Sequence, residues 1–326
     1  MNRQTIELLT PCFCGGAWPR EEAELRVPSL RGQLHFWARL LHHSPADPRA
    51  MARDEQNLLG GVNSKQVGIR QDAVASPFVP RLELRSRPAS ASERADVCPH
   101  DSSKHDRPAI PAGTLFDLAW SRRVSAGNST DAEFQRVLKA WLLFGGLGAR
   151  VNRAAGSVWP VWPGGDPTVD QFLALVSSLT LPPTVLVRVL PSPISLGDPT
   201  AKRVWNAWEK GHRQPTEAET LRAVAGDIPI FGRDARKVFG IRGDPFGHAR
   251  RGGRQASPLK LKVARFMERD HTIFRLIAVA DDRDKRGGSR SAAVTALCAG
   301  YSPPTKSYDR SWNAKPLGFL LQAAGF

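Results

Sequence analysis

The chain has 326 residues, 41% of them hydrophobic, and its 46 Lys and Arg against 31 Asp and Glu give a formal net charge of +15. This hydrophobic content is enough for a packed core and excludes global disorder, and the length suits two domains of ordinary size. An excess of positive charge favours a polyanionic partner, and arginine suits bidentate contact with phosphate. Composition therefore predicts a nucleic-acid partner. The alternative is a soluble basic enzyme.

The cysteines Cys12, Cys14, Cys98 and Cys298 are too few for a disulfide framework. The N-terminal segment lacks the apolar core of a signal peptide, and no run of apolar residues reaches the length of a membrane span. We expect a cytoplasmic protein with reduced thiols. Cys12-x-Cys14 together with Cys98 offers a metal site as an alternative, but structural zinc sites prefer a two-residue gap. We predict neither a metal nor a cofactor.

Hydrophobic periodicity predicts the elements of the first half in order. Residues 5–13 form a strand, and residues 28–43 form a helix that buries Leu30, Leu34 and Trp37 on one face. A polar connection follows at 44–53. Further predictions are strands at residues 66–70, 78–85, 113–122 and 157–162, a mobile insertion at 87–111, and a helix at 131–144 with a capping box of Thr130 and Glu133. The order β-α-β-β-α-β is that of ferredoxin-like domains, which RNA-recognition domains share.

The second half follows a linker at residues 163–167. Periodicity predicts helices at residues 169–179 and 201–210, strands at 184–190, 258–266 and 272–280, and an arginine-rich segment at 228–258. We predict that this half repeats the first architecture. The fold class is therefore α+β, with two fused ferredoxin-like domains at residues 1–165 and 166–326 and a flexible insertion at 87–111.

Residues 143–158, LFGGLGARVNRAAGSV, combine glycines with Arg150, Asn152 and Arg153. Glycine lets the backbone adopt positive φ and approach a ligand closely. The segment is not a P-loop, because no GK[ST] follows the glycines, and it follows a helix instead of a strand, which excludes a dinucleotide fingerprint. It predicts a platform for an extended single strand of nucleic acid. The alternative is an ordinary helix C-cap and turn.

The helix at residues 28–43 carries Arg31, His35, Arg39 and His42 at helical spacing opposite its apolar face. This face is a candidate phosphate contact, with Gly32 allowing close approach. The alternative is a solvated charged face. His35 has a pKa range suited to general acid–base catalysis, but the sequence places no second catalytic group beside it.

Four stretches together resemble the RAMP superfamily of CRISPR proteins, and within it the first-subunit family of the type III-B (Cmr) effector complex. They are residues 10–17 (TPCFCGGA), 26–39 (RVPSLRGQLHFWAR), 143–158 and 254–262 (RQASPLKLK). The resemblance implies two fused ferredoxin-like domains. It also implies a non-catalytic subunit that caps the effector's backbone and contacts guide (CRISPR) RNA toward its 3′ region and target RNA, with other RAMP subunits as partners in antiviral defence.

The resemblance assigns RNA contacts by position, and we add His35 and Asn152 from the residues themselves. The predicted RNA-binding set is Ser29, Arg31, Gly32, His35, Arg39, Gly146, Gly148, Arg150, Asn152, Arg153 and Arg254. His35 stands where the family commonly has arginine, and Ala155 where it commonly has glycine. The alternative function is a metal-independent RAMP-type endoribonuclease that processes guide RNA with His35 as general base.

Overall fold

The computed structural model describes residues 2–16, 18, 20–42, 47–62, 73–89, 94–96, 106–123, 128–190, 216–219, 221–222, 225, 248–250, 253–255 and 259–281. The strand predicted at 66–70, the helix predicted at 201–210 and most of the arginine-rich segment at 228–258 lie outside these residues. Cys98 and Cys298 also lie outside them.

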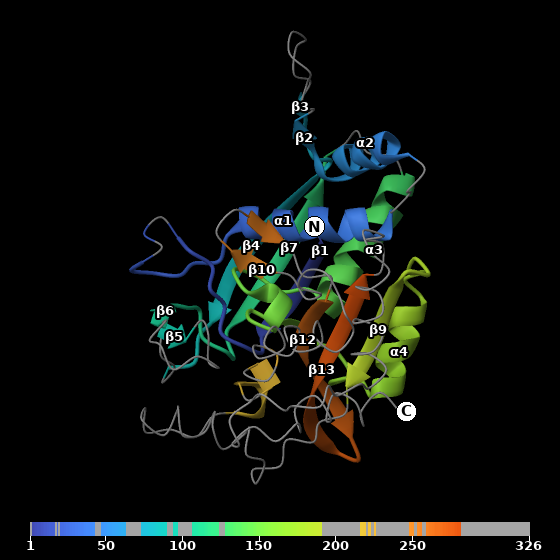
Figure 1. The fold of residues 1–326 in the computed structure, drawn as a ribbon. Helices are drawn as coiled ribbons and strands as arrows, with labels where there is room; N and C mark the ends of the chain where they lie inside the picture. The colour runs from blue at the N-terminus through green and yellow to red at the C-terminus, as the bar shows by residue number, and fades with distance from the viewer. Residues whose placement is uncertain are drawn as a thin grey trace.

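The first half contains a four-stranded sheet in the order β4-β7-β1-β8, with every neighbouring pair antiparallel (Figure 1). Its strands are β1 (Asn2–Leu8), β4 (Phe78–Ser86), β7 (Leu115–Arg122) and β8 (Val158–Pro160). Helices α1 (Val27–Leu41) and α3 (Asn128–Phe144) pack against each other. The principal elements thus follow the order β-α-β-β-α-β, and the predicted α+β class is confirmed.

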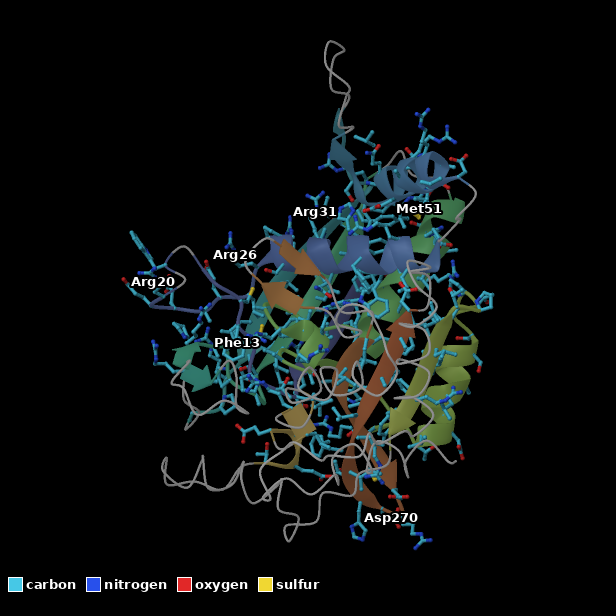
Figure 2. The ribbon with its side chains drawn as sticks, in the orientation of Figure 1. Phe13, Arg20, Arg26, Arg31, Met51 and Asp270 are labelled. Atoms are coloured by element: carbon cyan, nitrogen blue, oxygen red, sulfur yellow. The ribbon has the colours of Figure 1, made fainter. Side chains whose placement is uncertain are left out.

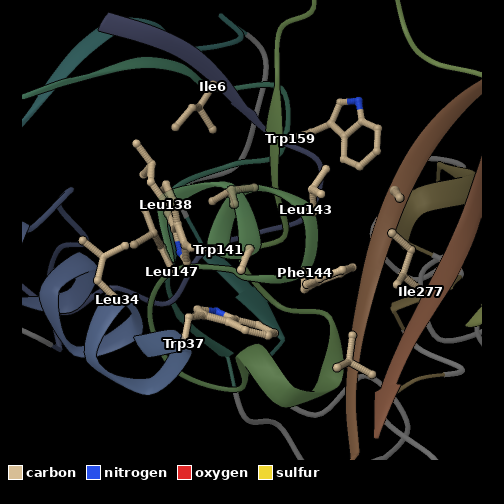
Figure 3. Close-up of a cluster of buried hydrophobic side chains, with 14 of the residues drawn as sticks. Ile6, Leu34, Trp37, Leu138, Trp141, Leu143, Phe144, Leu147, Trp159 and Ile277 are labelled. Atoms are coloured by element: carbon tan, nitrogen blue, oxygen red, sulfur yellow. The ribbon is translucent and has the colours of Figure 1, made fainter. Parts of the chain in front are cut away.

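The core lies between this sheet and the two helices. Leu34 and Trp37 of α1 are buried, as the periodicity predicted, and meet Leu138 and Trp141 of α3 in one cluster (Figure 3). Ile277, from the second half, belongs to the same cluster. The apolar core is therefore continuous across both halves of the chain.

Two sequence predictions in the first half need correction. The strand predicted at residues 5–13 ends at Leu8, and beyond it Cys12 and Phe13 form only isolated bridges, to Ile110 and Ala149. The chain leaves the sheet there because this segment pairs with the glycine-rich loop. The capping box of Thr130 and Glu133 is also wrong, since α3 begins at Asn128 and Thr130 lies inside it.

The polar connection predicted at residues 44–53 contains the start of a helix, α2 (Pro48–Leu59). Asp47 caps it by accepting hydrogen bonds from the backbone N–H of Arg49 and Ala50, and Pro48 occupies the first helical position, where its missing N–H costs nothing. The helix ends at Gly60, which has a φ of 76°. This helix was not predicted from the sequence.

The insertion at residues 87–111 is not irregular throughout. Its described parts include β5 (Arg94–Asp96) and β6 (Asp106–Pro108), which pair with each other, and Ile110 exchanges backbone hydrogen bonds with Cys12. A second short pair, β2 (Gly61–Val62) and β3 (Ala73–Val74), follows α2.

The described part of the second half contains a three-stranded antiparallel sheet in the order β12-β13-β9. The strands of this sheet are β9 (Val185–Leu190), β12 (Leu259–Glu268) and β13 (His271–Asp281). The described part of this half also contains helix α4 (Val169–Ser177) and a separate strand pair, β10 (His248–Arg250) and β11 (Gly253–Gln255). The helix predicted at 169–179 and the strands predicted at 184–190, 258–266 and 272–280 are confirmed with small shifts of their ends. A second ferredoxin-like domain and the boundary at 165/166 stay predictions.

Within the described ranges, no helix has both the length and the apolar character needed to cross a membrane.

Candidate nucleic-acid interface

The loop at residues 143–158 is folded onto the segment that follows β1. The hydroxyl of Thr10 donates to the carbonyl of Ala154 (2.6 Å), and the N–H of Gly156 donates to the carbonyl of Pro11 (2.8 Å). Phe13 and Ala149 form an antiparallel bridge. These backbone contacts fix the loop's path, so its charged side chains project from a rigid support.

The loop's glycines permit close approach between backbones of the protein itself. Gly148 has a φ of 81°, and a Cβ there would lie 2.7 Å from the carbonyl oxygen of Phe13; a Cβ on Gly146 would lie 2.7 Å from the carbonyl oxygen of Gly156. The predicted need for positive φ is thus met at Gly148, with a structural cause. RNA contact by Gly146 and Gly148 stays a prediction. Ala155, the departure from the family pattern, is buried.

A short 3-10 helix, η1 (Val151–Arg153), lies at the centre of the loop. The residues on either side of it, Arg150 and Ala154, have φ values of 63° and 59°. Left-handed backbone is uncommon outside glycine and is often found at functional sites. This backbone leaves Arg150 exposed, while Asn152 and Arg153 are half-buried.

β12 meets the loop at η1. The ammonium of Lys260 lies 2.5 Å from Oδ1 of Asn152 and 3.8 Å from the centre of the Phe36 ring, and Arg153 donates to the carbonyls of Asn152 and Leu259. We call Phe36, Arg150, Asn152, Arg153 and Lys260 the cationic junction. Sequence reasoning missed Lys260 and Phe36; the signal was the alternation in residues 258–266, which marked a strand without indicating what it faced.

The charges of the cationic junction destabilise one another. Burial, and then the charge of Arg153, lowers the pKa of Lys260 to about 8, while Asp281 acts in the opposite direction. Burial, and then the charge of Arg150, lowers the pKa of Arg153 to about 10. A bound anion would relieve both effects, because a nearby opposite charge favours the charged form.

The basic residues of α1 face α2 instead of the loop. Arg31 donates to the carbonyl of Leu59 (3.1 Å), and both His35 and Arg39 reach Oε1 of Glu55, at 2.7 and 3.2 Å. Figure 2 labels Arg31 and Met51, which lie on α1 and α2 along this side of the molecule. The predicted basic stripe therefore exists, but it is held in part by a carboxylate of the helix that the sequence did not predict.

Another side of α1 borders the segment that follows β1 and carries Cys14. Oγ of Ser29 lies 3.2 Å from Sγ of Cys14, and Gly32 is exposed, with open space where a Cβ would project. Hydrogen bonds from Cys12 and Ser29 help to lower the pKa of Cys14 to about 6. Both thiols are buried and free. Among the residues that the structure describes, no group of three potential metal ligands occurs.

The structure therefore divides the predicted site residues into two groups. Asn152, in the loop with Arg150 and Arg153, is linked to α1 through Lys260 and Phe36. Arg31, His35 and Arg39 lie toward α2. Arg254 lies in β11, opposite Ala249, and its side chain falls outside the described part of the structure.

No protein-family model and no curated protein sequence matches the chain. Among solved structures it is similar to Cmr1 from Pyrococcus furiosus in the apo form (15% identity, covering 86% of this chain and 87% of that chain, TM-score 0.48). It is similar to a chain of the type III-B Cmr-beta complex bound to cognate target RNA and AMPPnP in the presence of ssDNA (12% identity, covering 99% of this chain and 98% of that chain, TM-score 0.49). It is also similar to a chain of a type IV-B CRISPR complex (16% identity, covering 48% of this chain and 88% of that chain, TM-score 0.35).

Proposed function

We propose that this chain is a non-catalytic RNA-binding subunit of a type III-B CRISPR effector, which contacts guide RNA toward its 3′ region and target RNA and assembles with other RAMP subunits. The observation that carries the proposal is the cationic junction. In it, Arg150 and Arg153 of a backbone-braced loop lie where Lys260 of β12 meets that loop, in a chain of net charge +15. Arginines on such a support suit the phosphates of a single strand, whose sequence would be read by base pairing with the guide.

The test replaces Arg150 with asparagine, because asparagine tolerates the left-handed backbone that this position adopts. We expect the affinity for a short single-stranded RNA to fall, and the slope of log affinity against log salt to decrease in magnitude by about 0.7 for one lost phosphate contact. Fluorescence anisotropy across a salt series measures both. Arg188→Asn is the matched control, because Arg188 is an exposed arginine on β9. Equal effects of the two substitutions would contradict an RNA contact at Arg150.

The absence of catalysis is part of this proposal and has its own test. His35 is hydrogen-bonded to Glu55, an arrangement that a general base also uses, so cleavage must be assayed directly. We expect repeat RNA to remain intact after incubation with the purified protein without metal. Site-specific cleavage that is lost in His35→Ala would replace the binding subunit with a RAMP-type endoribonuclease.

A further inference from the structure

Lys260 is a charged group with weak compensation in the described part of the structure. Its ammonium donates to the neutral amide oxygen of Asn152 and lies over the Phe36 ring. A lysine ammonium has three donors, and neither an amide nor a ring cancels a full charge as an anion does. The side chain is half-buried, so it retains access to solvent at the edge of the loop.

Among the described residues, charges of both signs act on Lys260. Arg153 acts on Lys260 from the loop, Arg150 acts in turn on Arg153, Asp281 acts on Lys260 from β13, and Phe36 lies on α1. Strained backbone at Arg150 and Ala154 holds the two arginines in place. A clustering of cations on a backbone held in the left-handed region is typical of anion sites.

We propose that Lys260 is a further ligand for an RNA backbone phosphate and that it completes, with Arg150 and Arg153, one phosphate site where β12 meets the 143–158 loop. The inference rests on the proposed function. Because a phosphate favours the ammonium form, RNA binding takes up a proton at Lys260. The free protein holds the pKa of Lys260 at about 8, so affinity falls as the pH rises through this value.

The experiment measures the dissociation constant of a short single-stranded RNA at about pH 7 and about pH 9, at fixed ionic strength, for the wild type, Lys260→Arg and Lys260→Met. We expect the wild type to lose affinity by up to about tenfold, because about a tenth of a group with this pKa remains protonated at the higher pH. Lys260→Arg should retain affinity at both pH values, since arginine stays charged. Lys260→Met should bind weakly at both. Lys139→Met removes the same charge from α3 and serves as the control.

The outcomes separate this inference from the function on which it rests. An equal pH dependence in the wild type and Lys260→Arg overturns the Lys260 assignment while leaving RNA binding intact. Failure of the wild type to bind RNA at the lower pH overturns the proposed function and this inference with it. Thermal unfolding midpoints of the variants verify that each is folded. If Lys260→Met does not fold, the comparison of the wild type with Lys260→Arg still decides the test.

Discussion

Two glycines of the predicted RNA-binding set have different structural roles. Gly148 has positive φ and no space for a side chain, because a Cβ would meet the Phe13 backbone at 2.7 Å. Gly32 lies in α1 with open space around it. Glycine in a helix interior destabilises the helix relative to alanine. Gly32 is therefore a position where the fold gains nothing from glycine, which is compatible with a close approach by a ligand.

We expect Gly148→Ala to lower the free energy of unfolding by about 1–3 kcal/mol, because it adds backbone strain and a clash. Gly32→Ala should raise it by about 0.5–1 kcal/mol. Urea denaturation measures both values. If RNA approaches α1 at Gly32, Gly32→Ala should also weaken RNA binding despite its added stability. An unchanged stability in Gly148→Ala would mean that the loop leaves the Phe13 backbone in solution.

At the scale of elements, periodicity predicted the strands and helices that bury a full apolar face, such as α1 and β13. It failed at α2, which buries only Leu58 and Leu59. The sequence signals for the start of α2 are the capping residue Asp47 and Pro48 at the first helical position. Both lie in the segment that the sequence analysis predicted to be a polar connection. This omission changed the expected site as well, because α2 supplies Glu55, and a side chain's partner on another element cannot be read from its own helical spacing.

Glu55 competes with any phosphate for His35 and Arg39, since both contact the same carboxylate oxygen. We expect Glu55→Gln to raise RNA affinity by about two- to fivefold, the scale of a partly exposed ion pair. Asp54→Asn removes the same charge from an exposed neighbour on α2 and controls for long-range electrostatics. Anisotropy at fixed salt compares them. If both substitutions act equally, the basic face of α1 is a solvated surface and makes no phosphate contact.

At the scale of the whole molecule, the sequence predicted a boundary at 165/166, while β12 packs directly against the first half. Trp159 lies edge-on to Phe266, and the N–H of Ala154 donates to the carbonyl of Leu261. Arg265 forms ion pairs with both Glu7 and Asp166. These contacts join residues about 100 to about 260 positions apart, separations at which composition and periodicity carry no information.

Because the core is shared, we expect the described halves to unfold in one cooperative step. Urea curves from tryptophan fluorescence and from far-UV circular dichroism should coincide.

Arg265→Met leaves the carboxylates of Glu7 and Asp166 without their cation, and should lower the free energy of unfolding by about 1–3 kcal/mol, since a stranded, half-buried charge is costly. Both probes should shift together. Arg188→Met, at an exposed site on β9, should change stability by less than about 0.5 kcal/mol. Separate transitions that respond differently to Arg265→Met would instead favour two independent domains, joined at the boundary that the sequence predicted.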